Sequence, residues 1–176
     1  MQRVGRVSPT LSTNPSRAIV ASASVRGGSM AAPATKWAQK TISLPPYHRG
    51  CHLVTSKIVS EIGNDLSDFK CGLAHIFLQH TSASLTINEN YDSDVRDDTE
   101  TFLNRIVPEG RSALWKHTLE GPDDMPAHIK SSMFGCELTI PISQGKLNMG
   151  TWQGIWLCEH RDQPTSRKIV VTMNGM

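Results

Sequence analysis

This chain of 176 residues lacks several common sequence signals. No apolar run approaches the roughly 20 residues that a membrane-spanning helix needs, so we expect no membrane partner. The metalloprotease pattern HExxH, the P-loop and zinc-finger spacings are missing, and there is no GxSxG elbow for a nucleophilic serine. If the protein has an active site, the fold must assemble it from residues that are distant in the sequence.

Cysteine is scarce, and no CxxC pair occurs. The four cysteines are scattered, mostly in apolar stretches such as KCGLAHIF and IWLCEH: Cys51, Cys71, Cys136 and Cys158. A disulfide framework is not expected in a chain this long with so few cysteines. We therefore expect buried free thiols in a reducing compartment.

Acidic residues are absent from the first 60 residues of the chain; the first one is Glu61. Residues 1–35 contain four arginines and many serines and alanines, but no lysine and no acid. This composition predicts an organellar transit peptide, for a chloroplast in preference to a mitochondrion. The alternatives are a disordered tail, or a shorter cytoplasmic form that starts at Met30.

Beyond that segment there are 14 basic and 16 acidic residues, which argues against a nucleic-acid partner. We expect residues 36–176 to form one compact α+β domain, mainly an antiparallel sheet with helices packed on one side. Strands are expected near residues 36–44, 71–81, 136–142, 150–160 and 168–175. Helices are expected from about Thr55, within 91–107 and within 127–134.

Two of these helices have an apolar face in the sequence. The first predicted helix should bury Ile58, Val59 and Ile62. The second should bury a face that contains Val95, Thr99, Phe102 and Ile106, because these residues recur at steps of three and four.

The stretch EGPDDMPAHIK, residues 120–130, contains more polar groups than a turn and a helix start require. Gly121 and Pro122 predict a turn, and Asp123 is expected to cap the following helix. Asp124 and His128 are then free to face a ligand near the helix N-terminus. The alternative is a doubly capped helix with a surface histidine.

Other polar clusters follow apolar strands. They contain His80, Asn88 and Glu89 in QHTSASLTINEN, Gln153 in GTWQG and Glu159 in CEHRD. Each can also be read as a structural feature, such as a satisfied histidine at a strand end or a bulge glycine beside a packed tryptophan. If the fold gathers His80, His117 and His128 beside a carboxylate, they would form a site for zinc or another divalent metal.

The segments QKTISL, HTSASLTINEN, EGPDDMPAHIK and GKLNMGTWQGIWLCEHRD resemble the YjbQ family, whose members are often labelled secondary thiamine-phosphate synthase enzymes. The resemblance covers roughly Lys36 to Gly175. It implies a compact α+β domain that assembles as a homotrimer, with a histidine-lined pocket between or near subunits. It also implies a weak thiamine-phosphate synthase activity, which joins hydroxymethylpyrimidine diphosphate to thiazole phosphate.

The resemblance also implies which residues form the pocket. The catalytic residues would be His80, Glu89 and His128, and the metal ligands would be His80, His117 and His128. Contacts to a phosphorylated small-molecule substrate would come from Asn88, Asp124, Gln153 and Glu159. Apart from the resemblance, the charge of Lys130 suits contact with the departing phosphates.

The choice of metal bears on the chemistry. The synthase reaction calls for Mg²⁺ on a diphosphate, held by Asp123, Asp124 or Glu89, whereas histidine ligands favour zinc. Two alternatives therefore stay open: a metal-dependent hydrolase of a small metabolite, and a non-catalytic trimeric protein that binds a small anion.

Overall fold

A computed structural model describes residues 34–110 and 115–176 of the protein. The predicted N-terminal segment, residues 1–35, lies almost wholly outside these ranges. The helices and strands follow in the order β1 (Lys36–Tyr47), β2 (Gly50–Leu53), α1 (Thr55–Leu66), β3 (Cys71–Leu78), β4 (Ala83–Glu89), α2 (Asp94–Ile106), α3 (Asp124–Phe134), β5 (Glu137–Ser143), β6 (Lys146–Leu147), β7 (Gln153–Glu159) and β8 (Thr165–Gly175).

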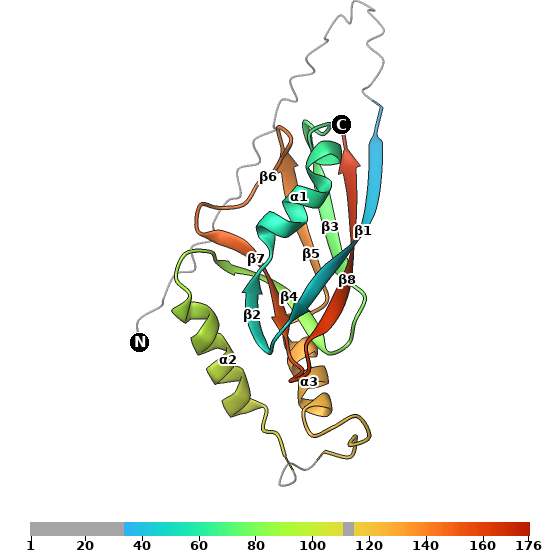
Figure 1. Ribbon diagram of the computed structural model, residues 1–176. Coiled ribbons are helices and arrows are strands. Elements are labelled where there is room, and N and C mark those ends of the chain that lie inside the picture. The colour runs from blue at the N-terminus through green and yellow to red at the C-terminus, as the bar shows by residue number, and fades with distance from the viewer. Residues whose placement is uncertain (1–33, 111–114) are drawn as a thin grey trace, which may run out of the picture. The chain divides into compact units, whose positions relative to one another are not determined.

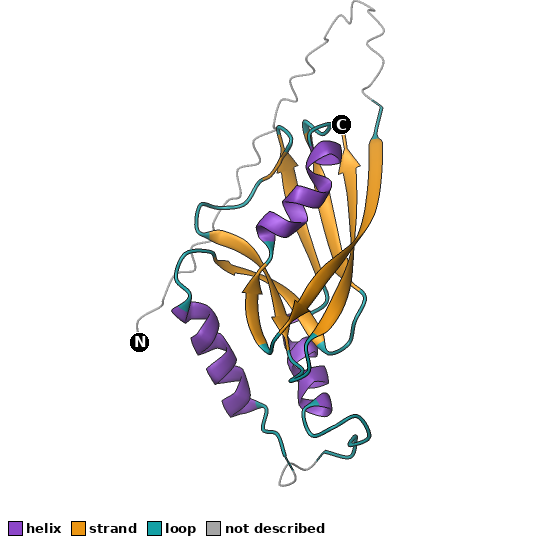
Figure 2. Ribbon diagram, in the orientation of Figure 1, coloured by secondary structure: helices purple, strands orange, loops and turns teal. Residues whose placement is uncertain are grey.

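The strands form two antiparallel sheets, as Figures 1 and 2 show. The large sheet has the order β1-β8-β3-β5-β6, and the small sheet has the order β2-β7-β4. Every paired strand runs antiparallel to its neighbour. The predicted α+β class with an antiparallel sheet is therefore confirmed.

The main core lies between the large sheet, the small sheet and helix α1. Alternate residues of the strands point into it, among them Ile76 of β3, Ile155 of β7 and Val171 of β8. Helix α1 contributes Ile58, Ile62 and Leu66. The expectation for Val59 was wrong: its side chain is exposed, since the buried face of α1 follows the steps Ile58, Ile62 and Leu66.

Helices α2 and α3 cover the other face of the small sheet, where the apolar cluster consists of Cys51, Trp156 and Cys158. Among the described residues the predicted apolar face of α2 is only partly buried: Val95 packs against this cluster, but the end of the face does not. Phe102 and Ile106 are 58% and 42% exposed, and Leu103 is the buried residue of this helix. Among the described residues, no helix has the length and apolarity needed to cross a membrane.

Candidate functional site

The candidate site forms where the chain enters helix α3. Gly121 has a φ of +115°, a conformation that favours glycine, and a side chain there would clash with Asp123. The turn leads the preceding segment back over the helix, so that His117 lies beside Asp124. Asp124 and His128 are four residues apart on α3 and therefore share one face of the helix.

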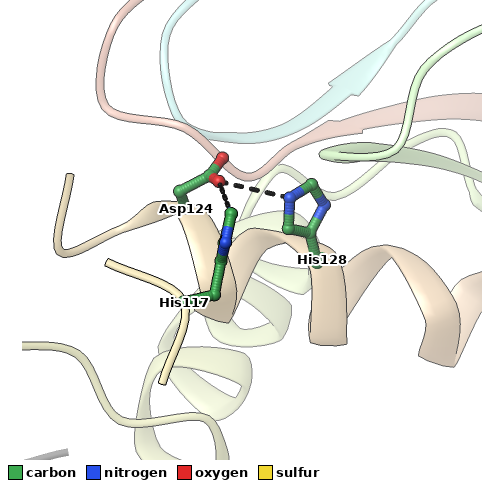
Figure 3. Close-up of side chains that lie close together, drawn as sticks. All are labelled: His117, Asp124 and His128. Carbon is green, nitrogen blue, oxygen red and sulfur yellow. Dashed lines mark hydrogen bonds and ion pairs between the residues drawn. The ribbon is translucent and has the colours of Figure 1, made fainter. Parts of the chain in front are cut away.

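Figure 3 shows both histidines pointing at the same carboxylate. The Nε2 atom of His117 lies 2.7 Å from Oδ2 of Asp124, and Nε2 of His128 lies 3.2 Å from the same oxygen. Ligand atoms of these three residues all lie within 4.8 Å of one another. Asp124 is buried, while the side chains of His117 and His128 are 41% and 31% exposed. The group therefore has a buried carboxylate and two histidines that are accessible to solvent.

The orientation of His128 favours a cation at this place. Its Nδ1 atom lies 2.9 Å from the carbonyl oxygen of Thr81, which can only accept a hydrogen bond. Nδ1 therefore carries the proton, and in a neutral ring Nε2 presents a lone pair to Oδ2 of Asp124. Two acceptors face each other unless a proton or a metal ion lies between them. Metal-binding histidines commonly donate their second nitrogen to a carbonyl in this way.

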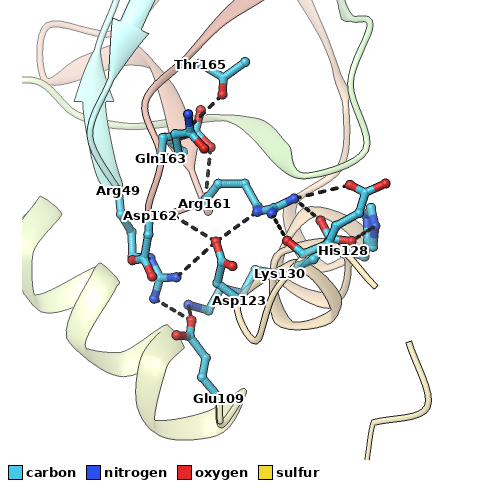
Figure 4. A network of polar contacts seen from close by, with 12 residues as sticks. Arg49, Glu109, Asp123, His128, Lys130, Arg161, Asp162, Gln163 and Thr165 are labelled. Atoms are coloured by element: carbon cyan, nitrogen blue, oxygen red, sulfur yellow. Dashed lines mark hydrogen bonds and ion pairs between the residues drawn. The ribbon is translucent and has the colours of Figure 1, made fainter. Parts of the chain in front are cut away.

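Arg161 fixes the Asp124 carboxylate, and Figure 4 shows the polar network in which Arg161 and Asp123 lie. Arg161 donates from Nη1 to Oδ1 of Asp124, from Nε to Asp123 (2.9 Å) and from Nη2 to the carbonyl of Glu120 (2.7 Å). This leaves Oδ2 of Asp124 for the two histidines. Burial raises the pKa of Asp123, but hydrogen bonds from the Asp162 amide and Arg161 outweigh it and hold this pKa below its usual value.

The expectation that Asp123 caps helix α3 was wrong. Its side chain makes no capping hydrogen bond. It accepts hydrogen bonds from Arg161 and from the amide of Asp162 instead, 38 and 39 residues along the chain.

His80 does not join the group. The amide of Lys168 donates to its Nε2 atom (3.0 Å), and Arg167 lies 3.3 Å from Nδ1. Burial, with the charge of Arg167, lowers the pKa of His80. Since its one lone pair already accepts a backbone hydrogen bond, the structure does not support its expected place among the metal ligands.

Glu159 is fully buried and forms a bidentate pair with Arg167, with N–O distances of 2.7 and 2.6 Å. Lys130 is also fully buried; it donates to Asn104 and lies 3.6 Å from Glu109. The expectation that Lys130 and Glu159 contact a substrate is at odds with this burial. Both residues hold the fold together beneath the site.

Asn88, Glu89 and Gln153 lie at the far end of β4 and β7. Six residues of β4 separate Glu89 from the end next to His128, a distance of about 20 Å. There the three residues line a cavity of about 580 Å³ with the exposed rings of Tyr91 and Trp152. Within one chain the expected pocket is therefore divided between two places.

The bulge or ligand contact expected at GTWQG has a different explanation. A side chain at Gly154 would clash with Leu53 and Asn90, so this glycine permits close packing of the chain itself.

Asp124 was expected to face a ligand together with His128 and was one of three residues considered for Mg²⁺; their spacing places both on one helical face. One residue of the site was missed in the sequence. Arg161 was not selected as a site residue, and no local signal connects it with Asp124, 37 residues away.

Comparison with known proteins shows which family this chain is similar to. The family model described as UPF0047 protein YjbQ-like matches residues 40–176. The UPF0047 protein YjbQ of Escherichia coli O157:H7 is 50% identical over 139 residues, which cover 79% of this chain and 99% of that protein. A UPF0047 protein of Synechocystis is 42% identical over 138 residues, covering 78% of this chain and 91% of the relative.

Solved structures agree with these matches. A YjbQ/UPF0047 family protein of Clostridium acetobutylicum superposes with a TM-score of 0.66 at 36% identity, covering 76% of this chain and 98% of that one. A protein of Sulfolobus solfataricus, described as of unknown function, superposes with a TM-score of 0.71 at 26% identity and covers 81% of this chain and all of its own.

Proposed function

Because the chain belongs to the UPF0047 (YjbQ-like) family and directs two imidazole nitrogens at one carboxylate oxygen, we propose that it is a divalent-metal-dependent enzyme. The observation that carries the proposal is the Nε2 atom of His128, whose lone pair faces Asp124 while Nδ1 is held by Thr81. Two nitrogen ligands and one oxygen ligand suit zinc better than Mg²⁺, which prefers oxygen alone.

The reaction that this site supports best is hydrolysis of a small metabolite with a phosphoryl or amide group. A zinc ion bound here would act as a Lewis acid on the substrate oxygen. Arg161 keeps Asp124 in position, and the carbonyl of Thr81 fixes the ring of His128. Glu120, whose carboxylate is 70% exposed beside Arg161, is available to take a proton from water.

The test combines binding and turnover. Equilibrium dialysis of the full chain should give one zinc ion per chain, and hydrolysis of a panel of small phosphate esters and amides should stop with a chelator and return with zinc. His75→Ala is a matched control, because His75 is also 41% exposed and lies outside the site. Zinc and anion binding without turnover would instead identify a non-catalytic binding protein, and absence of zinc binding would exclude the metal site.

Thiamine-phosphate synthase activity is the second candidate. The aromatic cavity with Asn88, Glu89 and Gln153 favours it, because Tyr91 and Trp152 offer faces on which a pyrimidine or thiazole ring can stack. The cavity and the metal ligands would act together only if they met between chains. Product formation from the two phosphorylated precursors, measured by chromatography, tests this candidate.

A homotrimer would allow the cavity of one chain to lie beside the metal ligands of another. What supports assembly is the apolar area that the described residues leave exposed, with Trp37, Tyr91, Leu119 and Trp152 each more than 60% exposed. Light scattering should give three times the mass of one chain at micromolar concentration. A monomer mass would remove both the trimer and the shared site.

A further inference from the structure

Two thiols lie against each other on the face of the small sheet that α2 and α3 cover. Cys51 of β2 and Cys158 of β7 are direct partners across the strand pair, and their sulfur atoms are 3.1 Å apart. Cys51 is 7% exposed, and Cys158 is fully buried. The proposed metal chemistry uses neither of them.

We propose that Cys51 and Cys158 are a peroxide-reactive dithiol that closes to a disulfide within the chain. Directly opposed residues of antiparallel strands have Cα atoms about 4.5–5.5 Å apart, within the range of about 4.4–6.8 Å that a disulfide spans. The bond therefore needs no shift of β2 relative to β7. This proposal is independent of the metal site and of the proposed reaction.

The chemistry balances with hydrogen peroxide as the oxidant. The Cys51 thiolate attacks one peroxide oxygen, the O–O bond breaks, and water leaves with the thiol proton, which gives a sulfenic acid. The Cys158 thiolate then attacks the Cys51 sulfur, the S–O bond breaks, and a second water leaves. Two thiols lose two electrons and two protons, and one peroxide becomes two water molecules.

The order of the two steps follows from access. Of these two thiols, only Cys51 has any exposed surface, so a small oxidant reaches it first. Cys158 then attacks the sulfenic acid from the interior. A bulky disulfide reagent would be excluded from this place. A peroxide is small enough to enter.

A serine hydroxyl lies beside Cys158 within the small sheet. Ser84 is the partner of Cys158 on its other side, in β4, and its hydroxyl oxygen lies 2.8 Å from Nε2 of His160. The hydrogen bond with Cys51 and burial raise the pKa of Cys158 well above its usual value; the nearby Glu100 carboxylate acts in the same direction, and Ser84 opposes them. Thiolate is therefore scarce at neutral pH, so the reaction is slow and accelerates with pH.

The other two cysteines provide internal controls. Cys71 is exposed at the start of β3, opposite Ser143, whereas Cys136 lies next to the far end of the same strand, where its carbonyl accepts from Leu78. About seven residues of strand, or roughly 23 Å, separate them. They cannot be joined within one chain.

The experiment treats the full chain with millimolar hydrogen peroxide, then denatures it, alkylates free thiols and maps the peptides by mass spectrometry. We expect a peptide pair joined through Cys51 and Cys158, lighter by two hydrogens, that forms several-fold faster at pH 9 than at pH 7. Cys71→Ser should leave this pair unchanged, and Cys51→Ser should abolish it.

Recovery of both Cys51 and Cys158 as free alkylated thiols after Cys71 has been fully oxidised would overturn the proposal. The wild-type peptide map decides this even if Cys51→Ser fails to fold.

Discussion

The His117–Asp124–His128 group and the His80–Glu159–Arg167 group contain the same kinds of side chain, but their carboxylates are used differently. In the second group Arg167 occupies both oxygens of Glu159, and the lone pair of His80 accepts a backbone amide. In the first, Arg161 occupies one oxygen of Asp124 and leaves the other to two half-exposed histidines. A carboxylate saturated by arginine stabilises the fold, whereas a buried carboxylate whose second oxygen faces two half-exposed histidines can help to bind a ligand.

The largest effect should come from breaking the ion pair between Glu159 and Arg167. Glu159→Gln leaves the buried guanidinium of Arg167 without its counter-charge, and we expect a loss of about 3–5 kcal/mol in the free energy of unfolding. Urea denaturation measures it. Glu120→Gln is the control, because the exposed Glu120 should change stability by only about 0.5 kcal/mol. An equal loss of unfolding free energy in the two variants would contradict the structural role assigned to the Glu159 carboxylate.

Zinc affinity should separate the histidines of the two groups. His117→Ala or His128→Ala removes a ligand and should raise the Kd for zinc by about 100-fold or more, a loss of about 2.7 kcal/mol in binding free energy. His80→Ala should leave the Kd within about twofold, because the ring of His80 is engaged by Lys168 and Arg167. Isothermal titration calorimetry measures all three. A comparable loss in His80→Ala would move the metal site toward Glu159.

Acid should destabilise the protein through histidines that are buried without charge. Burial and the charges of Lys130, Arg49 and Arg167 lower the pKa of His160 to about 3, against about 6.5 in the unfolded chain. Between these two pH values, His160 is protonated in the unfolded state but not in the folded state. Its full contribution to the free energy of unfolding is therefore present above about pH 6.5. Below that pH the free energy of unfolding falls by about 1.4 kcal/mol per pH unit.

We therefore expect a loss of about 2 kcal/mol between pH 6 and pH 4.5, measured by urea denaturation at each pH. The lowered pKa of His80 acts in the same direction. His160→Gln should flatten the dependence. A free energy of unfolding that stays constant over this range would mean that His160 can be protonated in the folded state.

The smallest effect distinguishes two roles of Asp123. Asparagine caps a helix about as well as aspartate, so Asp123→Asn would be neutral if the residue were a cap. Since Asp123 pairs with Arg161, which is partly exposed, we expect a loss of about 1 kcal/mol after allowance for solvent screening. Thermal unfolding of wild type and variant side by side reads this out, and identical midpoints would restore the capping role.

Local patterns in the sequence predicted the α+β class and the antiparallel strands, but neither the division into two sheets nor the pairing of polar groups. Alternation predicted the strand at residues 36–44, because side chains on opposite faces of a strand meet different environments, and a long apolar run predicted the strand at 71–81. The turn at Gly121 and the helix after it were likewise visible. The amphipathic pattern of α2 predicted burial for Phe102, yet within residues 34–110 and 115–176 its side chain is 58% exposed.

The polar contacts depend on residues that are distant in the sequence. His128 is oriented by Thr81, 47 residues earlier, and His80 is occupied by Lys168, 88 residues later. No pattern within either segment encodes these distances. For this reason the sequence grouped three histidines of which the structure brings together two, His117 and His128, beside Asp124.

Anomalous diffraction from crystals of the full chain grown with zinc tests the central claim most directly. We predict one strong peak per chain, at about 2.0–2.2 Å from Nε2 of His117, Nε2 of His128 and Oδ2 of Asp124. A peak bonded to His80, or no peak beside Asp124 at saturating zinc, would contradict the assignment of this group as a metal centre.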